Sequence, residues 1–314
     1  MAPAAAAPVR APSPFDLGDE AAYRRWRAAK LARHPARVEE LIVDVADPRA
    51  LNADEHAALL DRIARANMAL YRSPVLDEDR RLPRQLGAQF GLRRLDGHWL
   101  ADEDGVASIA VHDAAAAPEA AADRGAYIPY TDRPIRWHTD GYYHPAGHRI
   151  HAMILHCVRP AASGGVNRLL DHEMAYIALR DTSPEHIRAL MQDDAMTIPA
   201  RTDADGVARA AQSGPVFSVD PQGASLHMRY TARTRSIAWK ADAATQAARA
   251  CLEQLLASDP PWVFTIRMAS GMGFIGHNVL HDRSAFDDDP SRPRLLYRAR
   301  FLDRVQDERP CRTG

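Results

Sequence analysis

The stretch Ile135–His151 reads IRWHTDGYYHPAGHRIH and places four histidines and one aspartate within seventeen residues. Its centre is His138-Thr139-Asp140. Residues i and i+2 on a strand point to the same face, so this imidazole and this carboxylate are positioned to hold one cation together. Two ligands are too few for a tight site. The stretch therefore predicts a strand-based metal site whose third ligand comes from elsewhere in the chain.

The segment GHNVLHDRSAF supplies that ligand, and an arginine follows it. It contains His277 and His281, and Arg294 comes thirteen residues after His281. Two histidines and one carboxylate on one face of an octahedron form the facial triad of non-haem Fe(II) oxygenases, which leaves positions open for a cosubstrate and O2. A guanidinium beside such a site is a natural receptor for a carboxylate, because it offers two parallel charge-assisted hydrogen bonds.

Three blocks in this order resemble the taurine dioxygenase-like branch of the Fe(II)/2-oxoglutarate-dependent oxygenases. They are WHTDG (Trp137–Gly141), HCVRPAASGGVNRLLDHE (His156–Glu173) and NVLHDRSAFDDDPSRPRLLYR (Asn278–Arg298). With the strands between them they cover most of the chain from about Tyr127 to Phe301, whereas the N-terminal third matches only loosely.

The resemblance implies a role for particular residues. His138, Asp140 and His281 would bind Fe(II) and carry catalysis, Arg294 would hold the distal carboxylate of the cosubstrate 2-oxoglutarate, and Arg298 would contact cosubstrate or substrate. One position departs from the family pattern: Asn167 stands where Thr is common as a second 2-oxoglutarate contact. An amide NH2 group donates to the same carboxylate, so we expect Asn167 to take over this role.

The resemblance also implies a dioxygenase that hydroxylates an aliphatic C–H bond and releases succinate and CO2. Asp140 argues against halogenation, because halogenating relatives carry a small residue there. The pattern leaves open whether the outcome is hydroxylation, desaturation or another oxidation. Tyr142, Tyr143 and Arg298 are candidate substrate contacts. Arg298 and the cluster Arg229–Arg235 favour a small anionic or amino-acid-like substrate, although surface arginines are the default explanation for the cluster.

Several alternatives stay open at this point. His277 competes with His281 as the third ligand, because residues i and i+4 on one strand share a face; the sequence context favours His281. We expect His156 to be a packed, hydrogen-bonded core histidine, and His148 and His151 to lie in or beside a loop. The same triad would suit a Zn(II)-dependent hydrolase, which would need neither Arg294 nor O2. A catalytically silent jelly-roll binding protein is the third alternative.

The pattern of hydrophobic residues predicts a mainly β protein with helical decoration. Short apolar runs separated by Gly, Pro, Asp and Ser are typical of an antiparallel sandwich or jelly roll rather than of a doubly wound α/β fold. The resemblance implies a double-stranded β-helix (jelly roll) core. The predicted strands are 40–45, 105–112, 149–158, 166–170, 214–219, 225–230, 262–268, 273–281 and 294–301. The predicted helices are 19–34, 52–69, 172–179, 184–191 and 244–256.

Composition narrows the class further. The net charge of −1 and the pI near 6.9 favour neither nucleic acid nor a membrane surface as a partner. Three cysteines at wide spacing argue against a disulfide framework and favour a reducing cytoplasm. We expect residues 1–15 to form a disordered tail and residues 16–314 to form a single oxygenase domain with a helical N-terminal region. A homo-oligomer is compatible with the sequence, which does not fix the oligomeric state.

Overall fold

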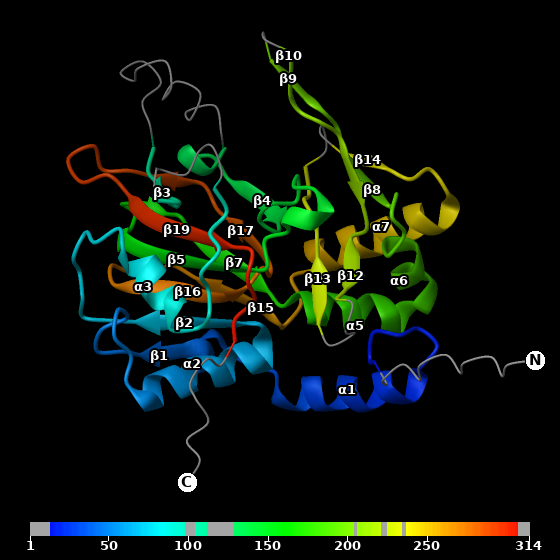
Figure 1. The fold of residues 1–314 in the computed structure, drawn as a ribbon, viewed down its shortest axis with the longest axis horizontal. Helices are drawn as coiled ribbons and strands as arrows, with labels where there is room; N and C mark the ends of the chain where they lie inside the picture. Colours follow the sequence, from blue (N-terminus) through cyan, green and yellow to red (C-terminus); the bar gives the residue numbers. More distant parts are fainter. Residues whose placement is uncertain are drawn as a thin grey trace, which may run out of the picture.

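The computed structural model describes residues 13–97, 104–111, 128–203, 206–220, 225–233 and 237–306. Its centre is a pair of β-sheets (Figure 1). The larger sheet has the order β1 (Ile42–Asp44), β2 (Met68–Arg72), β16 (Met272–His277), β5 (Ala152–Arg159), β19 (Leu295–Phe301) and β3 (Val106–Ile109). The smaller sheet has the order β15 (Val263–Ile266), β7 (Asn167–Leu170), β17 (Leu280–Arg283) and β4 (Ile135–His138).

The inner faces of the two sheets share one apolar core. Met153 of β5 and Phe274 of β16 pack with Leu169 of β7 and Phe264 of β15. Side chains alternate between the two faces of a strand, so every second residue of β5 and β19 points at the smaller sheet. This alternation also directs Arg298 and Arg300 inward, on the same face as Leu296.

Two helices cover the outer face of the larger sheet, at the lower left of Figure 1. Helix α2 (Ala53–Ala66) buries Leu59 and Ile63, and α3 (Leu82–Ala88) buries Leu86, in a core with β2, β5 and β19. The sequence determines where α2 begins: the Asn52 side chain accepts from the Glu55 amide, and the Glu55 side chain accepts from the Asn52 amide. These two hydrogen bonds form a capping box.

A second group of helices packs with short strands on the other side of the molecule (Figure 1). The helices are α1 (Glu20–Arg33), α5 (His172–Thr182), α6 (Pro184–Leu190) and α7 (Ala243–Ala257). The strands beside them are β8 (Met196–Ile198), β11 (Gln212–Gly214), β12 (Phe217–Val219), β13 (Leu226–Met228) and β14 (Ala238–Trp239). Short pairs β9 (Arg201–Asp203) with β10 (Gly206–Arg209), and β6 (Ser163–Gly164) with β18 (Phe286–Asp287), complete the strands.

Most predicted helices and strands are found close to their predicted limits, but three predictions were wrong in an informative way. The strand predicted over 214–219 is divided, because Gly214 ends β11 and Phe217–Val219 form β12 in another sheet. The helix predicted over 52–69 ends at Ala66, because Asn67 adopts a left-handed conformation (φ 58°) and the chain continues as β2. The strand predicted over 273–281 is two strands, β16 and β17, which belong to different sheets. Helix α3 and strand β2 were not predicted, and a short 3-10 helix (Val38–Leu41) precedes β1 where one strand was predicted.

The proposed division of the chain remains a prediction. Residues 1–12 lie outside the described part of the structure. Phe15, which was assigned to the tail, is 4% exposed, and its ring packs edge-on against Trp26 and Tyr176. Among the described residues, no helix combines the length and the apolar character needed to cross a membrane.

Candidate metal centre

Two neighbouring strands of the smaller sheet bring the predicted histidines together. Strands β4 and β17 pair antiparallel, with His138 directly opposite His281 and their ring centroids 4.2 Å apart. Each of these residues and Asp140 offers one ligand atom, and the three atoms lie within 4.8 Å of one another. The structure thus assembles, from segments 140 residues apart, the group that the sequence pattern predicted.

The orientation of both rings leaves one nitrogen available to a metal. His138 Nδ1 lies 2.9 Å from the carbonyl oxygen of Arg136, and His281 Nδ1 lies 3.0 Å from that of Val279. A carbonyl only accepts, so Nδ1 carries the proton in each ring and Nε2 presents its lone pair. Metal-binding histidines are commonly held in this way, because the outer hydrogen bond fixes tautomer and ring orientation.

Asp140 does not lie on a strand, which corrects one expectation. Strand β4 ends at His138, and Asp140 follows in a turn closed by Gly141. Gly141 has φ +66°, and a Cβ there would lie 2.5 Å from Ile150 Cγ1, so only glycine fits. The turn still brings Asp140 Oδ1 within 3.9 Å of His138 Nε2.

Asn278 holds the backbone of Asp140 in place, a role that sequence reasoning missed. Its side-chain oxygen accepts from the Asp140 amide at 2.8 Å. Its NH2 group donates to the carbonyls of Asp140 at 2.8 Å and Ile150 at 3.0 Å. Asn278 sits where the chain passes from β16 to β17, and a buried polar residue between two apolar strands was the signal for such a role.

The charges around the triad keep its groups in the form that binds a cation. Burial and, to a smaller extent, the neighbouring His281 lower the pKa of His138 to about 3, so the imidazole is neutral. Burial raises the pKa of Asp140, but the guanidinium groups of Arg298 and Arg300 outweigh it and hold this pKa below its ordinary value. Asp140 Oδ2 is buried and has no hydrogen-bond partner in the described structure. An ionised, buried oxygen without a donor fits a cation.

The competing histidine, His277, is placed apart from this group. It is the last residue of β16 in the larger sheet, whereas His281 lies on β17 in the smaller one. The expectation that the two share a face of one strand was therefore wrong, because the chain turns at Asn278 and Val279. Burial holds the pKa of His277 well below its ordinary value.

Arg294 is a buried cation without a hydrogen-bonding partner for its guanidinium among the described residues. It is 5% exposed and precedes β19, and its guanidinium lies 4.9 Å above the ring of Phe286. Its backbone amide, not its side chain, bonds to Asp288. Burial lowers the pKa of Arg294. A charge left in this state fits an anionic ligand, because a buried charge is costly unless it is paired.

Asn167 lies two residues from Gly165, which is close to Arg294. It begins β7, is 8% exposed, and its Nδ2 donates to the carbonyl of Gly165 at 3.3 Å. Gly165 is next to Arg294, since a Cβ at that glycine would lie 3.8 Å from Arg294 Nε. One amide hydrogen of Asn167 is thus used within the protein, and the second is the donor that the predicted cosubstrate contact requires.

Of the candidate substrate residues, Arg298 contacts the triad directly. Arg298 donates to Asp140 Oδ1 at 3.3 Å, and its buried Nε has no partner in the described structure. Tyr143 accepts a hydrogen bond from Arg300 at 3.1 Å through its hydroxyl. The Tyr142 and Tyr143 rings meet edge-on with centroids 5.2 Å apart. Arg300, fully inside and facing Asp140, is a second functional candidate that the sequence did not single out.

The arginine cluster is divided by the structure. Arg229 is buried, and its guanidinium donates to four backbone carbonyls, so the surface explanation was wrong for this residue. Arg233 is exposed, and Arg235 lies outside the described residues. His156 is fully buried and its Nδ1 lies 2.8 Å from the Tyr71 hydroxyl, which confirms its prediction as a core histidine.

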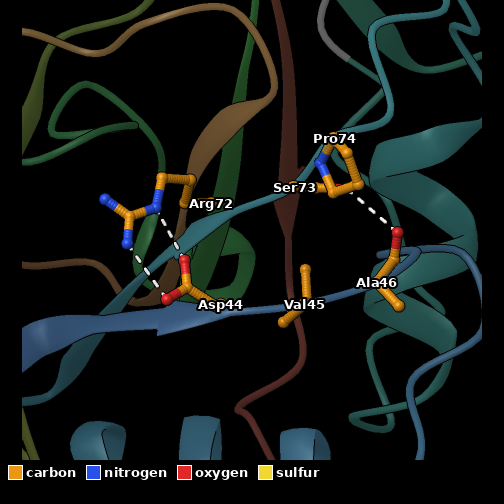
Figure 2. A pocket seen from close by; sticks show the side chains of 6 residues that line it. All are labelled: Asp44, Val45, Ala46, Arg72, Ser73 and Pro74. Carbon is orange, nitrogen blue, oxygen red and sulfur yellow. Dashed lines mark hydrogen bonds and ion pairs between the residues drawn. The ribbon is translucent and has the colours of Figure 1, made fainter.

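A hollow at the edge of the larger sheet is unrelated to the triad. It lies beside β1 and β2, and its lining consists of Asp44, Val45, Ala46, Arg72, Ser73 and Pro74 (Figure 2). Arg72 and Asp44 pair across it at 2.6 Å, and both side chains are exposed. An exposed ion pair of this kind contributes little to stability. Asp44 is the only carboxylate, histidine or cysteine among the residues that line the hollow.

Comparison with known proteins supports the same assignment. Residues 29–300 match the model of the TauD, TfdA family, described as taurine catabolism dioxygenase. A uridine-5'-phosphate dioxygenase from Amycolatopsis is 32% identical over 172 residues, which cover 53% of this chain and 60% of the relative. A protein of the same name from Streptomyces is 34% identical over 178 residues, covering 54% and 62%. The matched part spans less than two thirds of either relative.

Solved structures show the same fold. A taurine dioxygenase from Burkholderia xenovorans superimposes with a TM-score of 0.54 at 22% identity, covering 85% of this chain and 89% of that one. The non-heme iron oxygenase OrfP, in complex with Fe and alpha-ketoglutaric acid, gives 0.55 at 16% identity, covering 82% and 81%. The predicted mainly β fold with a jelly-roll core is thereby confirmed. Since the family model spans residues 29–300, this chain belongs to the TauD, TfdA family of dioxygenases.

Proposed function

We propose that this protein is an Fe(II)- and 2-oxoglutarate-dependent dioxygenase that oxidises a C–H bond of a small anionic molecule. The observation that carries the proposal is the pairing of two features. The ligand atoms of His138, Asp140 and His281 meet within 4.8 Å, and the buried guanidinium of Arg294 has no hydrogen bond among the described residues. A Zn(II) hydrolase would use the first feature only.

The residues divide the work as follows. His138, Asp140 and His281 would hold the iron through two Nε2 atoms and a carboxylate oxygen, and Asn278 fixes the position of Asp140. Arg294 and Asn167 would orient the far carboxylate of 2-oxoglutarate. A bound iron would supply the reaction with O2, in which 2-oxoglutarate would be oxidised to succinate and CO2. The apolar core between the sheets limits access of water.

Arginines beside the triad favour an anionic substrate. Arg298 has a buried Nε without a partner next to Asp140, and Arg300 lies two residues farther on the same face of β19. Arg209 lies 5.3 Å from the ring centre of Tyr143. Because the two matched relatives are named uridine-5'-phosphate dioxygenases, a nucleoside 5'-monophosphate is the first substrate class to test. Tyr142 and Tyr143 would then contact its organic part.

The test is a comparison of turnover with and without O2. We expect the Fe(II) protein to form succinate from 2-oxoglutarate faster when uridine 5'-phosphate is added, and to do so only in air. Uridine and taurine serve as comparison compounds, since one lacks the phosphate and the other lacks the nucleoside. Product formed by the Zn(II) protein without O2 would establish the hydrolase instead. Stimulation by none of these compounds, with succinate still formed, would reject the substrate class but not the reaction.

A further inference from the structure

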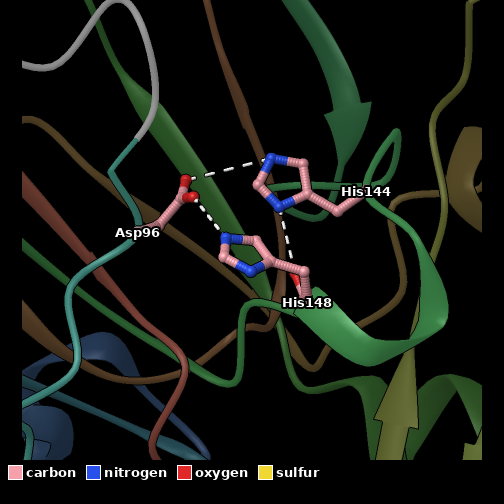
Figure 3. A group of neighbouring side chains, drawn as sticks. All are labelled: Asp96, His144 and His148. Carbon is pink, nitrogen blue, oxygen red and sulfur yellow. Dashed lines mark hydrogen bonds and ion pairs between the residues drawn. The ribbon is translucent and has the colours of Figure 1, made fainter. Parts of the chain in front are cut away.

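A second group of side chains of the types that bind metals combines Asp96 with two histidines that follow Asp140 in the chain. Asp96, His144 and His148 each offer a ligand atom, and these atoms lie within 4.8 Å of one another (Figure 3). His148 Nε2 is 3.0 Å from Asp96 Oδ1, and His144 Nε2 is 3.9 Å from Asp96 Oδ2. The group consists again of two imidazoles and one carboxylate.

The His144 ring is held in the same manner as the two histidines of the triad. Its Nδ1 lies 3.0 Å from the carbonyl of His148, so Nδ1 donates and Nε2 presents its lone pair toward Asp96. His144 Nε2 and Asp96 Oδ2 are 3.9 Å apart, which is too far for a hydrogen bond between them but is a separation that two ligands of one ion, each at about 2.0–2.2 Å, can have.

The guanidinium group of Arg300 positions Asp96. The Asp96 side chain is 2% exposed, Arg300 donates to Oδ2 at 2.5 Å, and Oδ1 is directed at His148. Ligating carboxylates are commonly hydrogen-bonded in this way from behind. The His148 side chain is 44% exposed, so the group is reached from solvent.

We propose that Asp96, His144 and His148 form a second metal site, separate from the triad, for a transition ion such as Zn(II), Co(II) or Ni(II). Two imidazole donors select such ions over Mg(II) and Ca(II), which take oxygen ligands. A bound ion would connect the segment after Asp140, which carries His144 and His148, to Asp96. Arg300 contacts Asp96 and Tyr143, and its charge also lowers the pKa of Asp140. The second site therefore lies next to the triad.

The experiment isolates the second site by removing the first. The full chain is stripped with a chelator, and bound Co(II) is measured by equilibrium dialysis and by its visible absorption. We expect a His138→Ala/His281→Ala chain to keep one tightly bound ion per chain, and the same chain with His148→Ala added to lose it. His186→Ala, which changes a histidine on α6 outside both groups, is the matched control and should keep the ion.

The outcomes separate this proposal from the proposed function, because the chain under test lacks the triad. No bound Co(II) in the His138→Ala/His281→Ala chain, with its circular dichroism unchanged, would overturn the second site. So would retention of the ion after His148→Ala. If His148→Ala alters the circular dichroism, His148→Gln replaces it, since this partly exposed position tolerates a side chain of similar length; the ion must then be lost as well.

Discussion

His138 and Asn278 meet Asp140 from two sides: His138 Nε2 lies 3.9 Å from the Asp140 carboxylate, and the Asn278 amide bonds both the N–H and the C=O of Asp140. Two features therefore set the position of the carboxylate. One is the turn that follows β4, and the other is Asn278, which links β16 to β17. The metal centre thus depends on both sheets, although its two histidines belong to one of them.

The first prediction concerns the triad. His138→Ala, Asp140→Ala and His281→Ala should each abolish succinate formation coupled to substrate and weaken Fe(II) binding, with circular dichroism unchanged. His277→Ala is the matched control, because this histidine lies on the other sheet, and it should retain Fe(II). Iron loss in His277→Ala with iron retained in His281→Ala would mean that the ligand assignment is wrong.

The second prediction concerns Asn278. Asn278→Ala leaves a buried N–H and two buried carbonyls near Asp140 without their partner, and each unsatisfied group costs about 1–3 kcal/mol. We expect a lower free energy of unfolding in urea and weaker Fe(II) binding. Asn278→Asp should keep the acceptor but lose both donors and add a charge beside Asp140. Wild-type iron affinity in both variants would remove Asn278 from the support of the site.

The third prediction concerns Gly141. Gly141→Ala places a Cβ against Ile150 Cγ1 in a left-handed conformation, and overpacking alone costs about 1–3 kcal/mol. Thermal unfolding should occur at lower temperature and Fe(II) should bind more weakly. Adding Ile150→Ala relieves the clash but not the strained φ, so we expect partial recovery of iron binding. Full recovery of iron binding would show that the left-handed φ at position 141 does not require glycine.

The fourth prediction concerns pH. Burial lowers the pKa of His156 to about 4, so this histidine is neutral in the folded protein. As the pH falls from about 6.5 to about 4, the unfolded chain binds a proton that the folded chain does not, which removes about 3 kcal/mol of stability. Urea unfolding of wild type and His156→Gln between pH 8 and 4.5 measures this. Equal pH slopes for the two proteins would contradict it.

The sequence predicted the chemistry of the site better than its geometry. The triad residues and Arg294 were recognisable because their residue types and order carry the information. That Asp140 lies in a turn, and that His277 and His281 belong to different sheets, depends on how the two sheets face each other, which a local pattern does not encode. Strand β2 was missed for a related reason: its apolar run continues that of α2, and only the left-handed Asn67 separates them.

Asn278, Arg300 and Arg229 show a second limit of the sequence. Each is a buried polar side chain whose role is set by partners far along the chain, such as Asp140 for Asn278 and Asp96 for Arg300. Arg229 was interpreted as a surface residue in an arginine-rich segment, yet its guanidinium donates to the carbonyl of Tyr142 and to three carbonyls of strands β8 and β11. Such contacts follow from tertiary packing alone.

We propose that the triad holds Fe(II) and that Arg294 holds 2-oxoglutarate beside it. The most direct test of this proposal is an anaerobic titration of the Fe(II) protein with 2-oxoglutarate, followed by the visible metal-to-ligand charge-transfer absorption. Wild type should develop this band. Arg294→Ala leaves a buried carboxylate unpaired, a loss of about 2–5 kcal/mol, which weakens 2-oxoglutarate roughly thirtyfold or more. Arg294→Lys should recover only part of this, since lysine lacks the bidentate fork.

The matched control is Arg292→Ala, an exposed arginine two residues earlier, which should titrate like wild type. Fe(II) affinity should be the same in all four proteins, because Arg294 is not a ligand. We expect a charge-transfer band in wild type and Arg292→Ala at low 2-oxoglutarate, and in Arg294→Ala only at far higher concentration. No band in wild type, or equal 2-oxoglutarate affinity in all four proteins, would contradict this proposal.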